Sequence, residues 1–323
     1  MGLMEYFGSL DPIKLLGNLP GGIGQGLIWG IMALGVYITF RLLDFADLSV
    51  DGTFATGGAV TVMLLLAGVP APLAVLIAVA AGIVAGCVTG LLHTLLGIPA
   101  ILSGILVQFM LYSINLRIMG MASNKAISVD KYDLILSSRY VSSAILIGAI
   151  FVLVLIAVMY WYFGTEQGSA IRATGTNPAM AKAQGINIGV MKVIGLALSN
   201  GLVALAGGLM AQYQGFADVS MGRGAIVIGL AAVIIGEVLC DAIFKKRKNF
   251  AVCLLFVAIG GVVYYMVVVV VLWMKLNSND LKLFTAVIVA VFLAIPYLRQ
   301  QQKSSFRRLS KQNKKQKEEL PNA

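Results

Sequence analysis

The sequence predicts an all-α, polytopic membrane protein with about nine (eight to ten) transmembrane helices, and three observations support this prediction. Of the 323 residues, 59% are hydrophobic and only 12% are charged, whereas a soluble domain carries about 25% charged residues. The mean hydropathy is +0.92. Several apolar stretches are long enough to cross the ~30 Å hydrocarbon layer, for which a helix needs about 20 residues.

Nine hydrophobic segments form the expected spans, and turn-forming residues separate several of them. The second segment is short and rich in Gly, Thr and Ala, which suits close helix packing in lipid. We expect an amphipathic segment over residues 1–20, one transmembrane domain over 21–298 and a basic tail over 299–323. The segments are Gly21–Phe40, Gly52–Ala67, Pro72–Leu96, Pro99–Met119, Val141–Phe163, Val190–Tyr213, Ala225–Phe244, Phe250–Met274 and Leu281–Leu298.

Clusters of basic residues predict the orientation. The polar loop 164–189, the run Lys245–Lys248 and the tail Arg299–Lys317 are successively two spans apart, so they share one side of the membrane. The positive-inside rule makes that side the cytoplasm, with an external N-terminus and a cytoplasmic C-terminus. Much of the net charge of +10 lies in the tail, which has no stacking aromatic apart from Phe306. We therefore reject nucleic-acid binding and expect topology and anionic-lipid contact instead.

Cysteine and histidine suggest neither a metal centre nor a catalytic group. Cys87, Cys240 and Cys253 stand alone in apolar surroundings, without the spacing of metal ligands. His93 is the only histidine, and we expect a packed imidazole or a helix-end residue there. The N-terminus does not show the basic-then-apolar pattern of a cleaved signal peptide.

An internal repeat is the most informative feature. FADLS at Phe45–Ser49 recurs as FADVS at Phe216–Ser220, and the pattern G-[IL]-[MV]-A-L-[GA] precedes both copies in the same register, from Gly30 and from Gly201. Five expected spans separate the copies, so they open toward opposite membrane faces. Such an inverted repeat is common in transporters, with broken helices near the midplane. We place the repeat cores at about 26–67 and 197–244.

The aspartates of the repeat need an explanation, because a carboxylate near the bilayer centre costs roughly 2.5–3.5 kcal/mol. Each should lie at a helix break, accept N–H bonds as an N-cap, or line water. We expect Asp47 or Ser49 to cap a helix whose first turn holds Asp51. Whether Asp47 and Asp218 contact cargo or only cap broken helices stays open. The candidate translocation-path residues are Phe45, Asp47, Ser49, Asp51, Phe216, Asp218 and Ser220.

The loop 164–189 carries the most specific motif. It is polar, helix-competent around Pro178–Ala183, and suited to docking a soluble partner. Its run GSAIRATGTNPAMAKAQGIN resembles the coupling loop of permease subunits from bacterial ABC importers, in the branched-chain amino acid and ribose permease superfamily. ALSNGLVALAGGL and RLLDFADLSVDGTFATGGA are also similar to this superfamily, and the resemblance covers most of Gly24–Glu237. The second run resembles a subgroup whose binding proteins are linked to tryptophan, tyrosine or related substrates.

The resemblance implies a permease subunit of an ATP-driven importer in the bacterial cell membrane, moving a small solute into the cytoplasm without chemistry on it. The expected cargo is an aromatic or other amino acid. The implied partners are cytoplasmic ATPase subunits, an extracytoplasmic substrate-binding (lipo)protein docked on the external loops, and a second permease copy. The implied ATPase-docking residues are Glu166, Gly168, Arg172, Gly175, Asn177, Pro178, Ala181 and Gly185.

No cofactor is expected on this chain. It contains no G-x-x-x-x-G-K-[ST], the loop that cradles nucleotide phosphates, so ATP and Mg²⁺ are expected on the separate ATPase chain. An ion-coupled secondary transporter is the alternative, because Asp47, Asp51, Asp218 and Glu237 would suit it, although a self-sufficient carrier needs no docking helix. A nucleoside or sugar cargo and a heterodimer with a paralogue also stay open.

Overall fold

The computed structural model describes residues 12–128, 131–244 and 249–274, together with the isolated positions 283, 286, 287, 290, 291 and 294. The described residues from Pro12 to Met274 belong to one compact unit, which contains every helix and strand between Pro12 and Trp273. The basic run Lys245–Lys248, the tail and most of the expected ninth span, Leu281–Leu298, lie outside the described residues.

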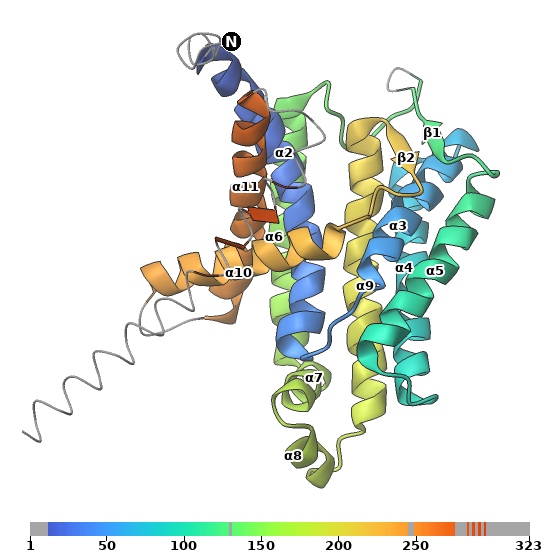
Figure 1. Cartoon of the computed structure of the whole chain (residues 1–323), viewed down its shortest axis with the longest axis vertical. Coiled ribbons are helices and arrows are strands. Elements are labelled where there is room, and N and C mark those ends of the chain that lie inside the picture. The colour runs from blue at the N-terminus through green and yellow to red at the C-terminus, as the bar shows by residue number, and fades with distance from the viewer. Residues whose placement is uncertain are drawn as a thin grey trace, which may run out of the picture. The chain divides into compact units, whose positions relative to one another are not determined.

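Helices make up most of the described chain (Figure 1). Seven of them are long and apolar enough to cross a membrane, and α3 is a shorter apolar helix. The first eight predicted segments each correspond to one helix, which confirms the all-α, polytopic class. The elements are α2 (Pro12–Tyr37), the π-helical turn η1 (Ile38–Leu42), α3 (Val50–Leu66), α4 (Ala71–Thr94), α5 (Ala100–Ile118), β1 (Asn124–Ala126), α6 (Val141–Gly164), α7 (Glu166–Thr176), α8 (Pro178–Ala183), α9 (Ile188–Gln214), β2 (Phe216–Asp218), α10 (Ala225–Ile243) and α11 (Phe250–Trp273).

Two local features differ from the expectation. Helix α2 begins at Pro12 and continues through Pro20, so residues 12–20 are part of the first spanning helix and not of a separate N-terminal segment. Proline at the first helical position lacks an N–H that would have no partner there in any case. A short antiparallel ladder also pairs β1 with β2, which ties the loop after α5 to the second copy of the repeat.

The helices approach one another closely through small residues. A Cβ added at Gly57 of α3 would lie 2.1 Å from the carbonyl oxygen of Ala204 in α9, and one at Gly86 of α4 would lie 2.3 Å from that of Leu196. Only glycine permits such backbone contact, which is a main source of helix association in lipid. The close packing predicted for the Gly-rich second segment is therefore confirmed.

The packing follows the internal repeat. Gly30 of α2 lies against Ala258 of α11, and Gly201 of α9 lies against Ile83 of α4. Gly30 and Gly201 are repeat-equivalent, meaning that they coincide when Phe45 is aligned with Phe216. The two repeat units are α2–α3–α4 and α9–α10–α11. The first helix of each repeat unit packs on the third helix of the other: α2 packs on α11, and α9 packs on α4.

The two units are inverted. Five apolar helices, the shorter α3 and the long α4, α5, α6 and α9, separate the two breaks in the chain. In Figure 1, α2 descends from the end of the bundle marked N and its break lies beyond its lower end, whereas α9 ascends and its break follows its upper end. The inverted arrangement expected from the span count is confirmed.

Candidate functional site

The first break, between η1 and α3, is organised by a buried carboxylate. Asp47 Oδ1 accepts hydrogen bonds from the backbone N–H of Ser49 (2.9 Å) and from Ser49 Oγ (2.6 Å). Asp47 Oδ2 accepts one from Asn200 Nδ2 of α9 (2.8 Å). Asp47 is 1% exposed, so these bonds replace the water that it loses. Ser49 occupies the N-cap position of α3 without a capping bond from its own side chain.

The second break repeats the same unit. Gly215, with a φ of 78°, ends α9 in the left-handed conformation that favours glycine. Asp218 Oδ1 then accepts bonds from the backbone N–H of Ser220 (2.7 Å) and from Ser220 Oγ (2.5 Å). Both predicted helix breaks are present, each with an Asp–x–Ser hydrogen-bonded turn. The prediction that Asp47 or Ser49 caps α3 is wrong, because Asp47 bonds to Ser49 itself and Ser49 makes no side-chain capping bond.

The surroundings of the two aspartates differ, however. Asp218 lies on β2 and is partly exposed, with Asn124 Nδ2 at 3.5 Å from its Oδ2. Burial acts to raise the pKa of Asp218, but the bonds from Ser220 and Asn124 and the charge of Arg223 outweigh it, so the pKa lies below its ordinary value. Asp218 is therefore ionised near neutral pH.

Asp51 joins the two breaks. It lies in the first turn of α3, as expected, but its carboxylate caps α10 of the other unit, accepting the N–H groups of Gly224 and Ile226 at 2.9 Å each. A helix N-terminus carries a partial positive charge that a carboxylate stabilises. Gly222 is repeat-equivalent to Asp51, and a Cβ there would lie 1.9 Å from the Asp51 carbonyl oxygen. The inverted repeat thus brings the start of α3 into contact with the segment that leads into α10.

The aromatic residues of the repeat are placed differently from each other. Phe45 is buried and meets the His93 ring edge-on, with 5.1 Å between centroids, whereas Phe216 is 36% exposed on β2. His93 lies at the end of α4 with Nδ1 2.8 Å from the Ile98 carbonyl and Nε2 3.0 Å from Lys192 Nζ. The expected packed, helix-end imidazole is confirmed, and Lys192 is the partner that sequence reasoning missed.

The polar loop after α6 forms two short helices at the lower end of the bundle (Figure 1). Thr165 Oγ1 accepts the Gly168 N–H at the start of α7, and Asn177 Oδ1 accepts the Met180 N–H at the start of α8. A Cβ at Gly175 would lie 1.9 Å from the Leu42 carbonyl oxygen. Helix α7 therefore rests directly on the start of the first break.

The residues implied for docking divide into two groups. Gly168 and Ala181 are buried, and Arg172 and Gly175 are partly buried, with the Arg172 guanidinium 5.9 Å from the ring centroid of Phe250. The outward-facing members are Glu166, Asn177, Pro178 and Gly185. Sequence reasoning missed Met180, which is 62% exposed on α8 and presents a large apolar side chain at this surface.

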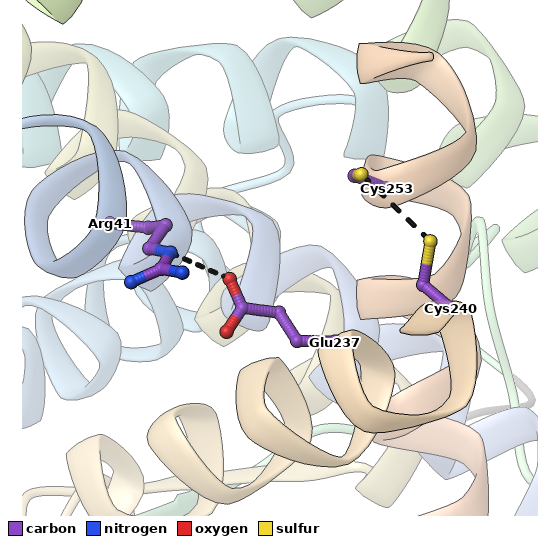
Figure 2. A network of polar contacts seen from close by, with 4 residues as sticks. All are labelled: Arg41, Glu237, Cys240 and Cys253. Carbon is purple, nitrogen blue, oxygen red and sulfur yellow. Dashed lines mark hydrogen bonds and ion pairs between the residues drawn. The ribbon is translucent and has the colours of Figure 1, made fainter. Parts of the chain in front are cut away.

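An ion pair also links the two units. Arg41 Nε of η1 lies 2.8 Å from Glu237 Oε1 of α10. Figure 2 shows these side chains pointing toward one another between the two helices. The same view contains Cys240 and Cys253, free thiols 3.9 Å apart on α10 and α11. Glu237, which sequence reasoning considered as an ion-coupling acid, is thus a bridging group. In the described part of the chain, no cluster of three or more His, Cys, Asp or Glu could hold a metal ion.

A cavity of about 380 Å³ lies beside Asp51. Side chains from the start of α3, from α5 and from the segment after β2 line it. They include Asp51, Gln108, Phe109, Tyr112, Asn115 and Arg223. Of these residues, only Asp51 was predicted from the sequence as a site residue. The polar residues of α5 were missed because, in the sequence, they are isolated within an apolar segment.

The chain matches the profile of one protein family, described as the permease component of branched-chain amino acid transport systems, over residues 18–296. It is 40% identical over 270 residues to the tyrosine transport system permease protein of Clostridioides difficile (strain R20291), which covers 84% of this chain and 88% of that protein. It is 32% identical over 182 residues to an uncharacterized protein of Rickettsia prowazekii (strain Madrid E), covering 56% and 63% of the two chains. No solved structure matches it.

Proposed function

Because the chain belongs to the family of permease components of branched-chain amino acid transport systems, we propose that it is the transmembrane subunit of an ATP-driven importer for tyrosine or a related aromatic amino acid. The observation that carries the cargo assignment is the 40% identity with a tyrosine transport system permease over most of both chains. The importer lies in the bacterial cell membrane, and the cargo passes through unchanged.

The ATPase-docking surface is the exposed side of α7 and α8. Glu166, Asn177, Pro178 and Gly185 face outward there, and Met180 supplies an apolar contact. ATP and Mg²⁺ bind to the ATPase chain. We assign this surface and the C-terminus to the cytoplasmic side, because the basic residues of the sequence gather in these segments.

The contacts inside the chain supply a route from this surface to the breaks. Helix α7 meets the backbone of the first break through Gly175 and Leu42. The adjoining turn η1 is tied to α10 by Arg41 and Glu237. A push on α7 by the ATPase therefore moves the ends of both repeat units, which is what switching between outward and inward openings requires.

The cargo arrives at the opposite end of the bundle. A substrate-binding protein docks on the loop between α5 and α6 and on the segment following α11. A second copy of the permease completes the path, which runs along the interface between the copies. An ion-coupled carrier has less support, because Asp47 is buried and bonded to Ser49 and Asn200, and Glu237 forms an ion pair with Arg41.

Co-purification tests this proposal. The chain is expressed with the ATPase subunit of its own transport system, and a variant with Met180→Glu and Asn177→Ala serves as the docking-deficient control. We expect a stable complex with the native chain and a weakened one with the variant. A native chain that binds no ATPase and carries L-tyrosine on an ion gradient alone would contradict the proposal.

A further inference from the structure

The cavity beside Asp51 has the features of a small-molecule site. Its volume of about 380 Å³ falls within the range of roughly 300–1,000 Å³ of ligand pockets. It lies at the point where the start of α3 and the segment leading into α10 meet, and α5 forms its remaining wall. Both repeat units therefore contribute to it, so any movement between the units changes its shape.

Asn115 is the least expected lining residue. Its side chain is fully buried (0% exposed), and its Nδ2 donates to the Gly52 carbonyl at 3.4 Å. Its Oδ1 has no hydrogen-bond partner in the described part of the chain. Exchanging the amide nitrogen and oxygen would point Oδ1 at another carbonyl, so the free acceptor is the better assignment. A buried acceptor without a partner is costly, and an N–H donor in the cavity would satisfy it.

Opposite charges lie on the cavity wall. Each carboxylate oxygen of Asp51 accepts one backbone N–H bond from the start of α10, which leaves further lone pairs for another donor. Arg223 is exposed at the same cavity, and a guanidinium can bind a carboxylate through two parallel hydrogen bonds. A zwitterion presents the matching pair of charges.

Two aromatic side chains complete the lining. Phe109 is 70% exposed and Tyr112 is 44% exposed, both on α5. Such rings pack favourably against another aromatic ring in offset or edge-on geometry. The cavity thus combines one acceptor, two opposite charges and an aromatic border.

We propose that this cavity is a binding site for the zwitterionic head and aromatic side chain of the amino-acid cargo. Arg223 binds the α-carboxylate, Asn115 Oδ1 and the Asp51 carboxylate accept from the α-ammonium, and Phe109 and Tyr112 border the side chain. This assignment rests on the proposed importer function, and it adds the residues that select an amino acid inside the membrane subunit.

A labelling experiment on the full chain in lipid nanodiscs tests the site without any partner subunit. The three native cysteines are replaced, and Gln108→Cys places one thiol in the cavity wall. We expect L-tyrosine to slow the reaction of this thiol with a polar thiol reagent at least about fivefold. Tyramine, which lacks the carboxylate, and 3-(4-hydroxyphenyl)propanoate, which lacks the ammonium group, should slow it much less. Ser142→Cys, exposed at the start of α6, is the control that should show no protection.

Transport by the assembled importer supplies the second readout. Arg223→Gln and Asn115→Leu should each lower kcat/KM for L-tyrosine uptake about tenfold or more, because each leaves a polar cargo group without its partner. Ile114→Ala, which lies next to Asn115 on an exposed part of α5, should leave uptake unchanged.

The results that overturn the site are distinct from those that overturn the importer. Unprotected labelling at Gln108→Cys, protection that is equal for tyramine, or wild-type uptake by Arg223→Gln would each refute the cavity assignment. If the native assembly shows no ATP-driven uptake, the importer proposal fails, while the labelling experiment still decides whether the cavity binds an amino acid.

Discussion

The strongest prediction about stability concerns the unequal support of the two Asp–x–Ser units. Asn200→Ala removes the 2.8 Å bond to buried Asp47, and leaving a buried acceptor without its partner costs roughly 1–3 kcal/mol. Asn124→Ala removes the corresponding contact of Asp218, which is 3.5 Å long and exposed. Substitutions at such surface positions usually stay within about 0.5 kcal/mol. We therefore expect Asn200→Ala to lower the free energy of unfolding by about 1–3 kcal/mol and Asn124→Ala to have almost no effect.

The assay is reversible unfolding in mixed micelles, followed by circular dichroism. Because Asn200→Ala also removes a bond to the Leu196 carbonyl, a double-mutant cycle with Asp47→Asn isolates the interaction between the two side chains. We expect a coupling energy above about 1 kcal/mol. A coupling energy near zero, or equal losses for Asn200→Ala and Asn124→Ala, would refute the view that the first break is held by a buried polar contact with α9.

Three further predictions concern the coupling helices and the second break. Gly175→Val places a side chain where a Cβ would already lie 1.9 Å from a backbone oxygen of the first break, so it should reduce ATP-driven uptake several-fold. Gly164→Ala, which has no atom within 4 Å of the added Cβ, is its control. Replacing Arg172, which packs on Phe250, together with Asn177, which faces outward, should uncouple ATP hydrolysis from transport, and unimpaired uptake would count against a coupling role for α7 and α8. The pKa of Asp218 is lowered in the folded protein, so its contribution to stability is present above the unfolded pKa and is lost as pH falls through the folded pKa. In thermal melts at graded pH, Asp218→Asn should therefore show a smaller decrease in Tm on the acid side than the native chain.

Much of the architecture could be predicted because it depends on local composition. Hydrophobic length located the helices, and the recurrence of FAD-[LV]-S located both breaks and, through the span count, their inversion. The extension of α2 back to Pro12 was missed. Pro20 lies inside this helix, where the usual rule that proline ends a helix does not hold.

The partners of the acidic residues could not be predicted, because they come from distant parts of the chain. Asp51 caps α10, and Asp47 is bonded to Asn200 of α9. No local sequence pattern predicts either contact, because both arise from the packing of one repeat unit on the other. The cavity beside Asp51 was missed for the same reason: Asn115 becomes informative only when its neighbours show that its Oδ1 has no partner.

Uptake of L-tyrosine by proteoliposomes that contain the permease, its ATPase subunit and its binding protein is the most direct test of an ATP-driven importer. We predict uptake that requires ATP and the binding protein, and that stops when the phosphate-binding lysine of the ATPase subunit is replaced. Uptake that persists without ATP and follows an imposed ion gradient would contradict this function.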